Sequence, residues 1–119
     1  MSDSTFPHRT YKAGQIIFRE GQRADCMYVV RTGKVELYLD EPEGKKSLAV
    51  IGVHGLFGEM GLIDNKPRSA HAVALEETDC LVFMKADLDK RMEKLDPFMQ
   101  ALIKVLVNTV RTSNKTKLK

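Results

Sequence analysis

The sequence lacks tryptophan, has only three histidines and two cysteines, and contains no long apolar run. No run approaches the roughly 18 apolar residues that a membrane-spanning helix needs, so we expect no membrane span. The first residues, MSDST, also lack the apolar core of a secretory signal peptide, which indicates a cytoplasmic protein. The net charge of +3 is too small to indicate nucleic-acid binding.

The few histidines and cysteines argue against metal-dependent and nucleophilic chemistry. A cupin-like metal site needs several histidines and a glutamate around one ion, but His8, His54 and His71 lie far apart in the sequence. There is no G-x-S-x-G motif and no plausible Cys/His pair. We therefore expect no catalytic residues and no metal site. Cys26 and Cys80 lie in apolar, strand-like runs and should be buried free thiols.

Short β-branched and apolar runs, separated by turn residues about every eight to twelve positions, indicate a mainly β domain with flanking helices. Strands are expected at 15–19, 26–31, 35–39, 46–51, 69–74 and 79–84. Residues 1–8 are polar and should be loose. The segment 32–34 should form a tight hairpin in which Gly33 takes a positive φ, and 40–45 a second hairpin loop.

Two helices should follow the strands. The first is expected at 86–94, and Asp96-Pro97 should begin a second, with Asp96 as the N-cap. The second should reach about residue 112, with a frayed tail at 113–119. Its apolar face is wider than that of an ordinary surface helix. The apolar residues are Phe98, Met99, Leu102, Ile103, Val105, Leu106, Val107 and Val110. Packing on the strands, a ligand lid and a homodimer seam all remain open readings.

The segment 57–70, FGEMGLIDNKPRSA, has the composition of an anion-binding cradle. Gly58 lets the backbone approach a ligand closely because it has no Cβ. A short helical turn at 59–63 would present free N–H groups, which favour a phosphate. After the turn at 64–67, Arg68 brings a planar set of donors suited to phosphate oxygens, and Ser69 adds a hydroxyl.

This segment resembles the phosphate-binding cassette of the cyclic nucleotide-binding domain, roughly F-G-E-[LM]-[AG]-L followed by R-[ST]-A. Its Glu-to-Arg spacing is similar to that of protein kinase A regulatory subunits, and the resemblance extends over about 11–110. It implies one domain over 1–119, with a double-stranded β-helix (a jelly-roll-like β-roll) over about 11–85. Two C-terminal helices would follow at about 86–112.

The resemblance also implies roles for individual residues. Glu59 would accept a hydrogen bond from a ribose 2′-hydroxyl, and Arg68 would pair with the cyclic phosphate. Ser69 would donate its hydroxyl and N–H to the same phosphate. Backbone N–H groups of Gly58 and Met60 would complete the phosphate site. For Glu59 alone, the alternative is a carboxylate that only complements a helix dipole.

The base would need an apolar wall. Matching the hairpins to the family puts Leu37 and Leu48 near it, although plain core leucines are nearly as good a reading. His71 stands where relatives often carry threonine or an aromatic residue, and we expect a strand histidine with satisfied hydrogen bonds.

The resulting hypothesis is a regulatory sensor that binds cyclic AMP or cyclic GMP, uses no cofactor and is not an enzyme. Relatives that favour cyclic GMP often carry threonine at the position of Ser69, so cyclic AMP is the expected ligand. The C-terminal helices should move with the ligand and act on an unknown downstream protein. No residues remain after them for a helix-turn-helix, so we expect no DNA-binding domain in this chain. The alternative is a ligand-free roll that serves as an interaction module.

Overall fold

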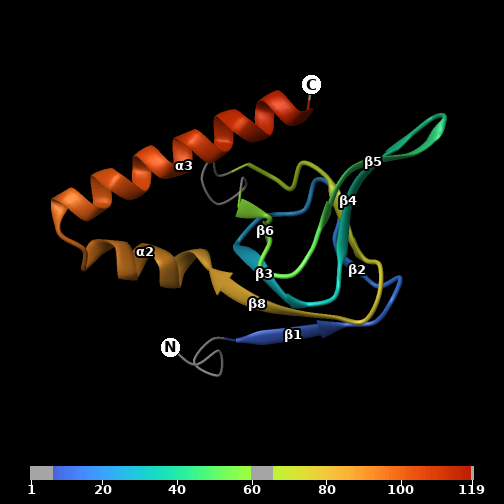
Figure 1. Ribbon diagram of the computed structural model, residues 1–119, viewed down its shortest axis with the longest axis horizontal. Coiled ribbons are helices and arrows are strands. Elements are labelled where there is room, and N and C mark those ends of the chain that lie inside the picture. Colours follow the sequence, from blue (N-terminus) through green and yellow to red (C-terminus); the bar gives the residue numbers. More distant parts are fainter. Residues whose placement is uncertain (1–6, 60–65, 119) are drawn as a thin grey trace. The chain divides into compact units, whose positions relative to one another are not determined.

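The computed structural model describes residues 7–59 and 66–118 (Figure 1). The chain divides into a β unit, Met1–Met84, and a helical unit, Lys85–Lys119. No helix in the described part is long and apolar enough to cross a membrane.

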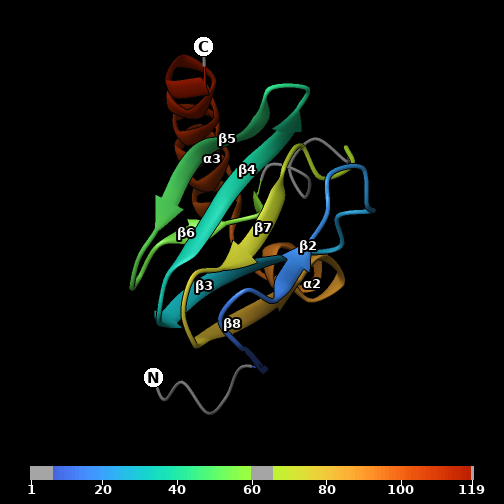
Figure 2. The same cartoon turned by 90° about the vertical axis from the view of Figure 1, so that its right-hand side faces the viewer.

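The described part of the β unit consists of two four-stranded antiparallel sheets, with strand orders β1-β8-β3-β6 and β2-β7-β4-β5. Figure 2 shows β7, β4 and β5 running alongside one another in the second sheet. The strands are β1 (His8–Tyr11), β2 (Ile16–Phe18), β3 (Cys26–Thr32), β4 (Val35–Glu41), β5 (Gly44–Ile51), β6 (Leu56–Phe57), β7 (His71–Ala74) and β8 (Thr78–Met84). The expected mainly β class with two C-terminal helices is confirmed.

The prediction of a hairpin at 32–34 is wrong. β3 pairs with β6 and β8, whereas β4 pairs with β5 and β7, so the turn carries the chain from one sheet to the other. Gly33 has the expected positive φ, 96°. A tight turn fixes the local backbone but not the partners of the flanking strands. Those partners are set by which runs bury their apolar faces together.

The sequence analysis did not predict the short strands β1 and β6, and it made the loop at 40–45 longer than it is in the structure. β1 is polar because it is an edge strand in which only Tyr11 is buried, so residues 8–11 lack a strand-like pattern. β6 contains only two residues. The expected loop at 40–45 shrinks to a turn at 42–43, because Glu41 pairs with Gly44.

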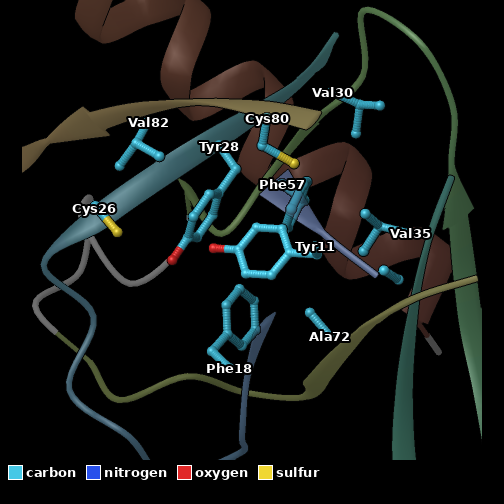
Figure 3. Close-up of a cluster of buried hydrophobic side chains, with 11 residues drawn as sticks. Tyr11, Phe18, Cys26, Tyr28, Val30, Val35, Phe57, Ala72, Cys80 and Val82 are labelled. Carbon is cyan, nitrogen blue, oxygen red and sulfur yellow. The ribbon is translucent and has the colours of Figure 1, made fainter. Parts of the chain in front are cut away.

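The core of the β unit is built around four aromatic rings, those of Tyr11, Phe18, Tyr28 and Phe57 (Figure 3). Tyr28 and Phe57 stack with their ring centroids 4.9 Å apart. The cysteines expected to be buried free thiols are confirmed as such. Burial, aided by the Asp79 carboxylate, raises the pKa of the Cys80 thiol to about 11.

The helical unit consists of α2 (Lys85–Glu93) and α3 (Pro97–Leu118) (Figure 1). The predicted N-cap is confirmed, because the Met99 N–H donates to Asp96 Oδ1 at 2.8 Å. The Gln100 amide joins the two helices by donating to the carbonyls of Met92 (2.9 Å) and Leu95 (3.0 Å). The end expected at about residue 112 is wrong. The helix continues to Leu118, and 113–118 contains no glycine or proline that would end it earlier.

Candidate functional site

Arg68 lies at the centre of the candidate site, and its backbone is anchored to the turn after β2. The Arg68 N–H donates to the Gln22 carbonyl at 2.8 Å, and the Arg68 carbonyl accepts from the Gly21 N–H at 2.9 Å. This pair of main-chain bonds fixes the point at which the Arg68 side chain enters the β unit.

The Arg68 side chain is buried, with only 5% of the residue exposed, so it is not a surface arginine. Nη1 donates to the Gly58 carbonyl at 2.8 Å, and Nη2 donates to the Cys26 carbonyl at 2.8 Å. The guanidinium carbon lies 4.2 Å from the ring centroid of Phe18 and 5.8 Å from that of Tyr28. Nε is buried without a hydrogen-bond partner among the described residues. One nitrogen of a permanently charged group therefore makes no hydrogen bond within the described residues.

Gly58 allows this arrangement. Its φ of 81° lies in the left-handed region, and a Cβ at this position would lie 2.8 Å from Arg68 Nη1. The sequence predicted that a ligand approaches the backbone of Gly58 closely. Within the described residues, the group that does so is the guanidinium of Arg68. A side chain here would displace the guanidinium.

The other cassette residues are described only in part. Glu59 is half-buried and Ser69 is exposed. Met60 and most of the helical turn expected at 59–63 lie outside the described residues. The roles of Gly58, Glu59, Met60, Arg68 and Ser69 toward a nucleotide stay predictions.

The two leucines expected at the base lie on neighbouring strands of the second sheet, and both are half-buried. Leu37 on β4 is opposite Ala49 and packs against the core cluster. Leu48 on β5 lies where the register shifts between Leu37 and Tyr38. The core reading therefore applies in part to Leu37, and a contact with a base stays a prediction for both.

His71 has satisfied hydrogen bonds, as expected. Its Nδ1 accepts from the Glu20 N–H at 3.1 Å, and its Nε2 lies 3.3 Å from the Asp40 carboxylate. The ring also packs 5.0 Å from that of Tyr38, measured between centroids. Both ring nitrogens are thus engaged within the β unit.

Sequence reasoning missed the residues that surround the Arg68 guanidinium, namely Phe18, Cys26 and Tyr28. The alternating burial along β3 puts Cys26 and Tyr28 on its inner face. Burial, together with the neighbouring Cys26 thiol, raises the pKa of the Tyr28 hydroxyl, which therefore stays neutral. The apolar alternation of β3 could have identified these side chains as core, but it carries no information about an arginine among them.

Comparisons with known proteins agree with this geometry. The pattern of the family described as "Cyclic nucleotide-binding domain" matches residues 8–94. The cyclic AMP receptor protein of Thermus thermophilus is 35% identical over 112 residues, which cover 93% of this chain and 52% of the relative. A type II regulatory subunit of cAMP-dependent protein kinase from Drosophila melanogaster is 28% identical over 94 residues, covering 79% of this chain and 24% of the relative.

Solved structures of the EAL enzyme Bd1971 are also similar, at 34% identity. The cAMP-bound form has a TM-score of 0.71 and covers 90% of this chain and 29% of that one. The cGMP-bound form has a TM-score of 0.72 and covers 94% and 30%. The chain spans about half the length of the Thermus thermophilus relative and about a quarter of that from Drosophila melanogaster. With its cassette motif, its two antiparallel sheets and a family match over most of its length, the chain belongs to the cyclic nucleotide-binding domain family.

Proposed function

We propose that this protein binds one cyclic nucleotide per chain as a regulatory sensor, prefers cyclic AMP and does not turn the ligand over. The observation that carries the proposal is the buried guanidinium of Arg68. A charge removed from water is costly unless it is paired. The structure gives Arg68 no carboxylate partner within 7–59 and 66–118, and its Nε has no acceptor there. An anionic ligand would supply what is missing.

Family membership supports a cyclic phosphate as that anion, and the bound forms of the similar EAL enzyme support either purine. In the proposed complex Arg68 pairs with the phosphate, assisted by Ser69 and by backbone N–H groups of Gly58 and Met60. Leu37 and Leu48 line the base. Isothermal titration with cyclic AMP tests the proposal, and 5′-AMP is the control ligand because it has the same base and sugar but an open phosphate.

Selectivity is proposed from Ser69. The serine side chain is smaller than that of the threonine often found at this position in relatives that favour cyclic GMP. Ser69 is also exposed. Competition of the two nucleotides against a fluorescent analogue should give the lower inhibition constant for cyclic AMP. A clear preference for cyclic GMP would show that Ser69 does not set selectivity.

Glu59→Ala is predicted to weaken binding by about 1.5–3 kcal/mol, the usual value of a hydrogen bond to a charged acceptor. It should also abolish the preference for cyclic AMP over its 2′-deoxyribose analogue, because the lost bond is the one to the 2′-hydroxyl. Titration of both ligands measures each effect. Glu43→Ala is the matched control, since it removes the same charge from the exposed turn at 42–43. If the variant still discriminates between the two sugars, Glu59 has another role.

The regulatory part of the proposal concerns α3. A ligand can shift a conformational equilibrium only if it binds one conformation better than another. We expect nucleotide to slow hydrogen exchange across 98–110 by more than across β3, which serves as the internal reference. Deletion from Val105 onward should weaken binding while leaving the β unit folded.

The exposed apolar residues Phe98, Val105 and Leu106 also suit a homodimer seam. Hydrogen exchange across 98–110 would then not change on adding nucleotide, and light scattering would give the mass of a dimer. That result would assign the apolar residues of α3 to the dimer seam and not to ligand-coupled movement.

A further inference from the structure

We propose that Phe18 is a positioning residue for the ligand, acting through Arg68. It would hold the guanidinium in one orientation, with Nε as the donor left for an anion. The inference rests on the proposed function and deepens it. Phe18 thereby has a role in ligand binding without touching the nucleotide.

Arg68 has three nitrogens that can donate hydrogen bonds. The terminal nitrogens of Arg68 are engaged on two sides, Nη1 with the Gly58 carbonyl and Nη2 with the Cys26 carbonyl, both at 2.8 Å. Nη2 also lies 3.6 Å from Cys26 Sγ. The Nε–H has no partner among the residues that the structure describes. The two carbonyls therefore each hold one terminal nitrogen, and Nε is the nitrogen that keeps no hydrogen bond and could meet an incoming anion.

Two aromatic rings lie near the guanidinium of Arg68. Hydrogen bonds to two carbonyls still allow the guanidinium to tilt, and an aromatic ring in contact with it restricts that motion. The Phe18 ring is the nearer of two, with its centroid 4.2 Å from the guanidinium carbon, whereas that of Tyr28 is 5.8 Å away. Cation–π attraction is strongest when, as here, the cation is desolvated. Phe18 is thus the larger aromatic contribution to the orientation of Arg68.

Phe18 is itself held in place by its neighbours. It is 7% exposed and lies 6.0 Å from Tyr28 and 6.1 Å from Phe57 between ring centroids (Figure 3). The β2–β7 register shifts between Ile16 and Phe18, an irregularity of the kind that re-aims a side chain. A rigid support of this kind spares the ligand the cost of ordering a long, flexible arginine.

The test is a double-mutant cycle between Phe18→Leu and Arg68→Lys, because lysine keeps the charge but loses the planar fork. In the parent background, Phe18→Leu should weaken cyclic AMP binding by roughly 5- to 10-fold, because the ligand then has to order the Arg68 side chain itself. In the Arg68→Lys background the same change should alter affinity by less than about threefold. Urea unfolding gives a parallel cycle without ligand, so coupling is measured even if Arg68→Lys binds too weakly to titrate.

Phe57→Leu is the matched control. It also removes a buried ring that contacts Tyr28 and Phe18, but none of the contacts of Arg68 described above involves Phe57. Its loss of stability should be independent of Arg68→Lys. If Phe18→Leu does not fold, Phe18→Met keeps the side-chain volume without the aromatic face. Phe18→Met should then show the loss of affinity, and the coupling to Arg68→Lys, expected of Phe18→Leu.

The possible outcomes separate the two hypotheses. If the parent binds no cyclic nucleotide, the proposed function fails. If the parent binds and Phe18→Leu leaves affinity unchanged, only the positioning role fails. A gain in affinity would also overturn the positioning role, because Phe18 would then hold Arg68 in an orientation that opposes ligand binding. Equal coupling of Phe57→Leu and Phe18→Leu to Arg68→Lys would reduce Phe18 to a general core residue.

Discussion

Arg68→Ala is expected to weaken cyclic nucleotide binding by about 2–5 kcal/mol, roughly a 30-fold to several-thousand-fold loss of affinity. The magnitude follows from burial, because the guanidinium is 5% exposed and the anion left behind would be desolvated without its partner. Titration calorimetry of parent and variant with cyclic AMP measures the effect. Arg19→Ala is the matched control, since Arg19 follows β2 directly but is exposed. It should change affinity by less than about threefold.

The same substitution should lower the free energy of unfolding without ligand. It leaves the carbonyls of Gly58 and Cys26 without their guanidinium donors, at a cost of about 1–3 kcal/mol for each group that stays buried and unsatisfied. Affinity must therefore be measured where circular dichroism shows the variant to be folded. A folded Arg68→Ala that binds as tightly as the parent would contradict the site.

Gly33→Ala is expected to destabilise the β unit by about 2–5 kcal/mol, combining left-handed backbone strain with overpacking. A Cβ on Gly33 would lie 2.4 Å from Thr78 Oγ1 and 2.5 Å from the Glu77 carbonyl oxygen. Thr78 is fully buried, and its hydroxyl bonds both the N–H and the carbonyl of Lys34. The methyl group cannot be accommodated without breaking that pair of bonds or moving backbone. Urea unfolding measures the loss.

Gly14→Ala separates strain from collision. Its φ of 84° is similar, but nothing lies within 4 Å of a Cβ built there. It should cost only the backbone term, about 1–2 kcal/mol. Equal effects of the two substitutions would mean that the turn between the sheets tolerates a side chain, against the packing observed around Thr78.

The sequence predicted most elements because their signals are local. Apolar and β-branched runs identified β3, β4 and β8, and Asp96 with Pro97 marked the start of α3 within one residue. Strand pairing was not local. The turn at Gly33 was predicted as a hairpin because a tight turn with a glycine occurs both in hairpins and in connections between two sheets. β1 escaped notice because an edge strand with one buried residue has almost no apolar alternation.

The candidate site was predictable in residue type but not in environment. The cassette motif put Gly58 and Arg68 in one cradle, and in the structure the Gly58 carbonyl accepts a hydrogen bond from Arg68, while their roles toward a nucleotide stay predictions. That Arg68 would be buried against Phe18 could not be read from the motif. The two residues are far apart in sequence and meet only because Arg68 is bonded to the turn at 21–22 that follows β2. Such a contact depends on three-dimensional packing rather than on spacing.

The most direct test of the central claim is isothermal titration of the full chain with cyclic AMP, repeated with 5′-AMP and with Arg68→Ala. The claim is that the buried, incompletely partnered guanidinium of Arg68 is the anion site of a cyclic nucleotide sensor. It predicts saturable binding of one cyclic AMP per chain, weaker binding of 5′-AMP, and a loss of affinity in the folded variant. No heat of binding with cyclic AMP or cyclic GMP at ligand concentrations up to millimolar would contradict it.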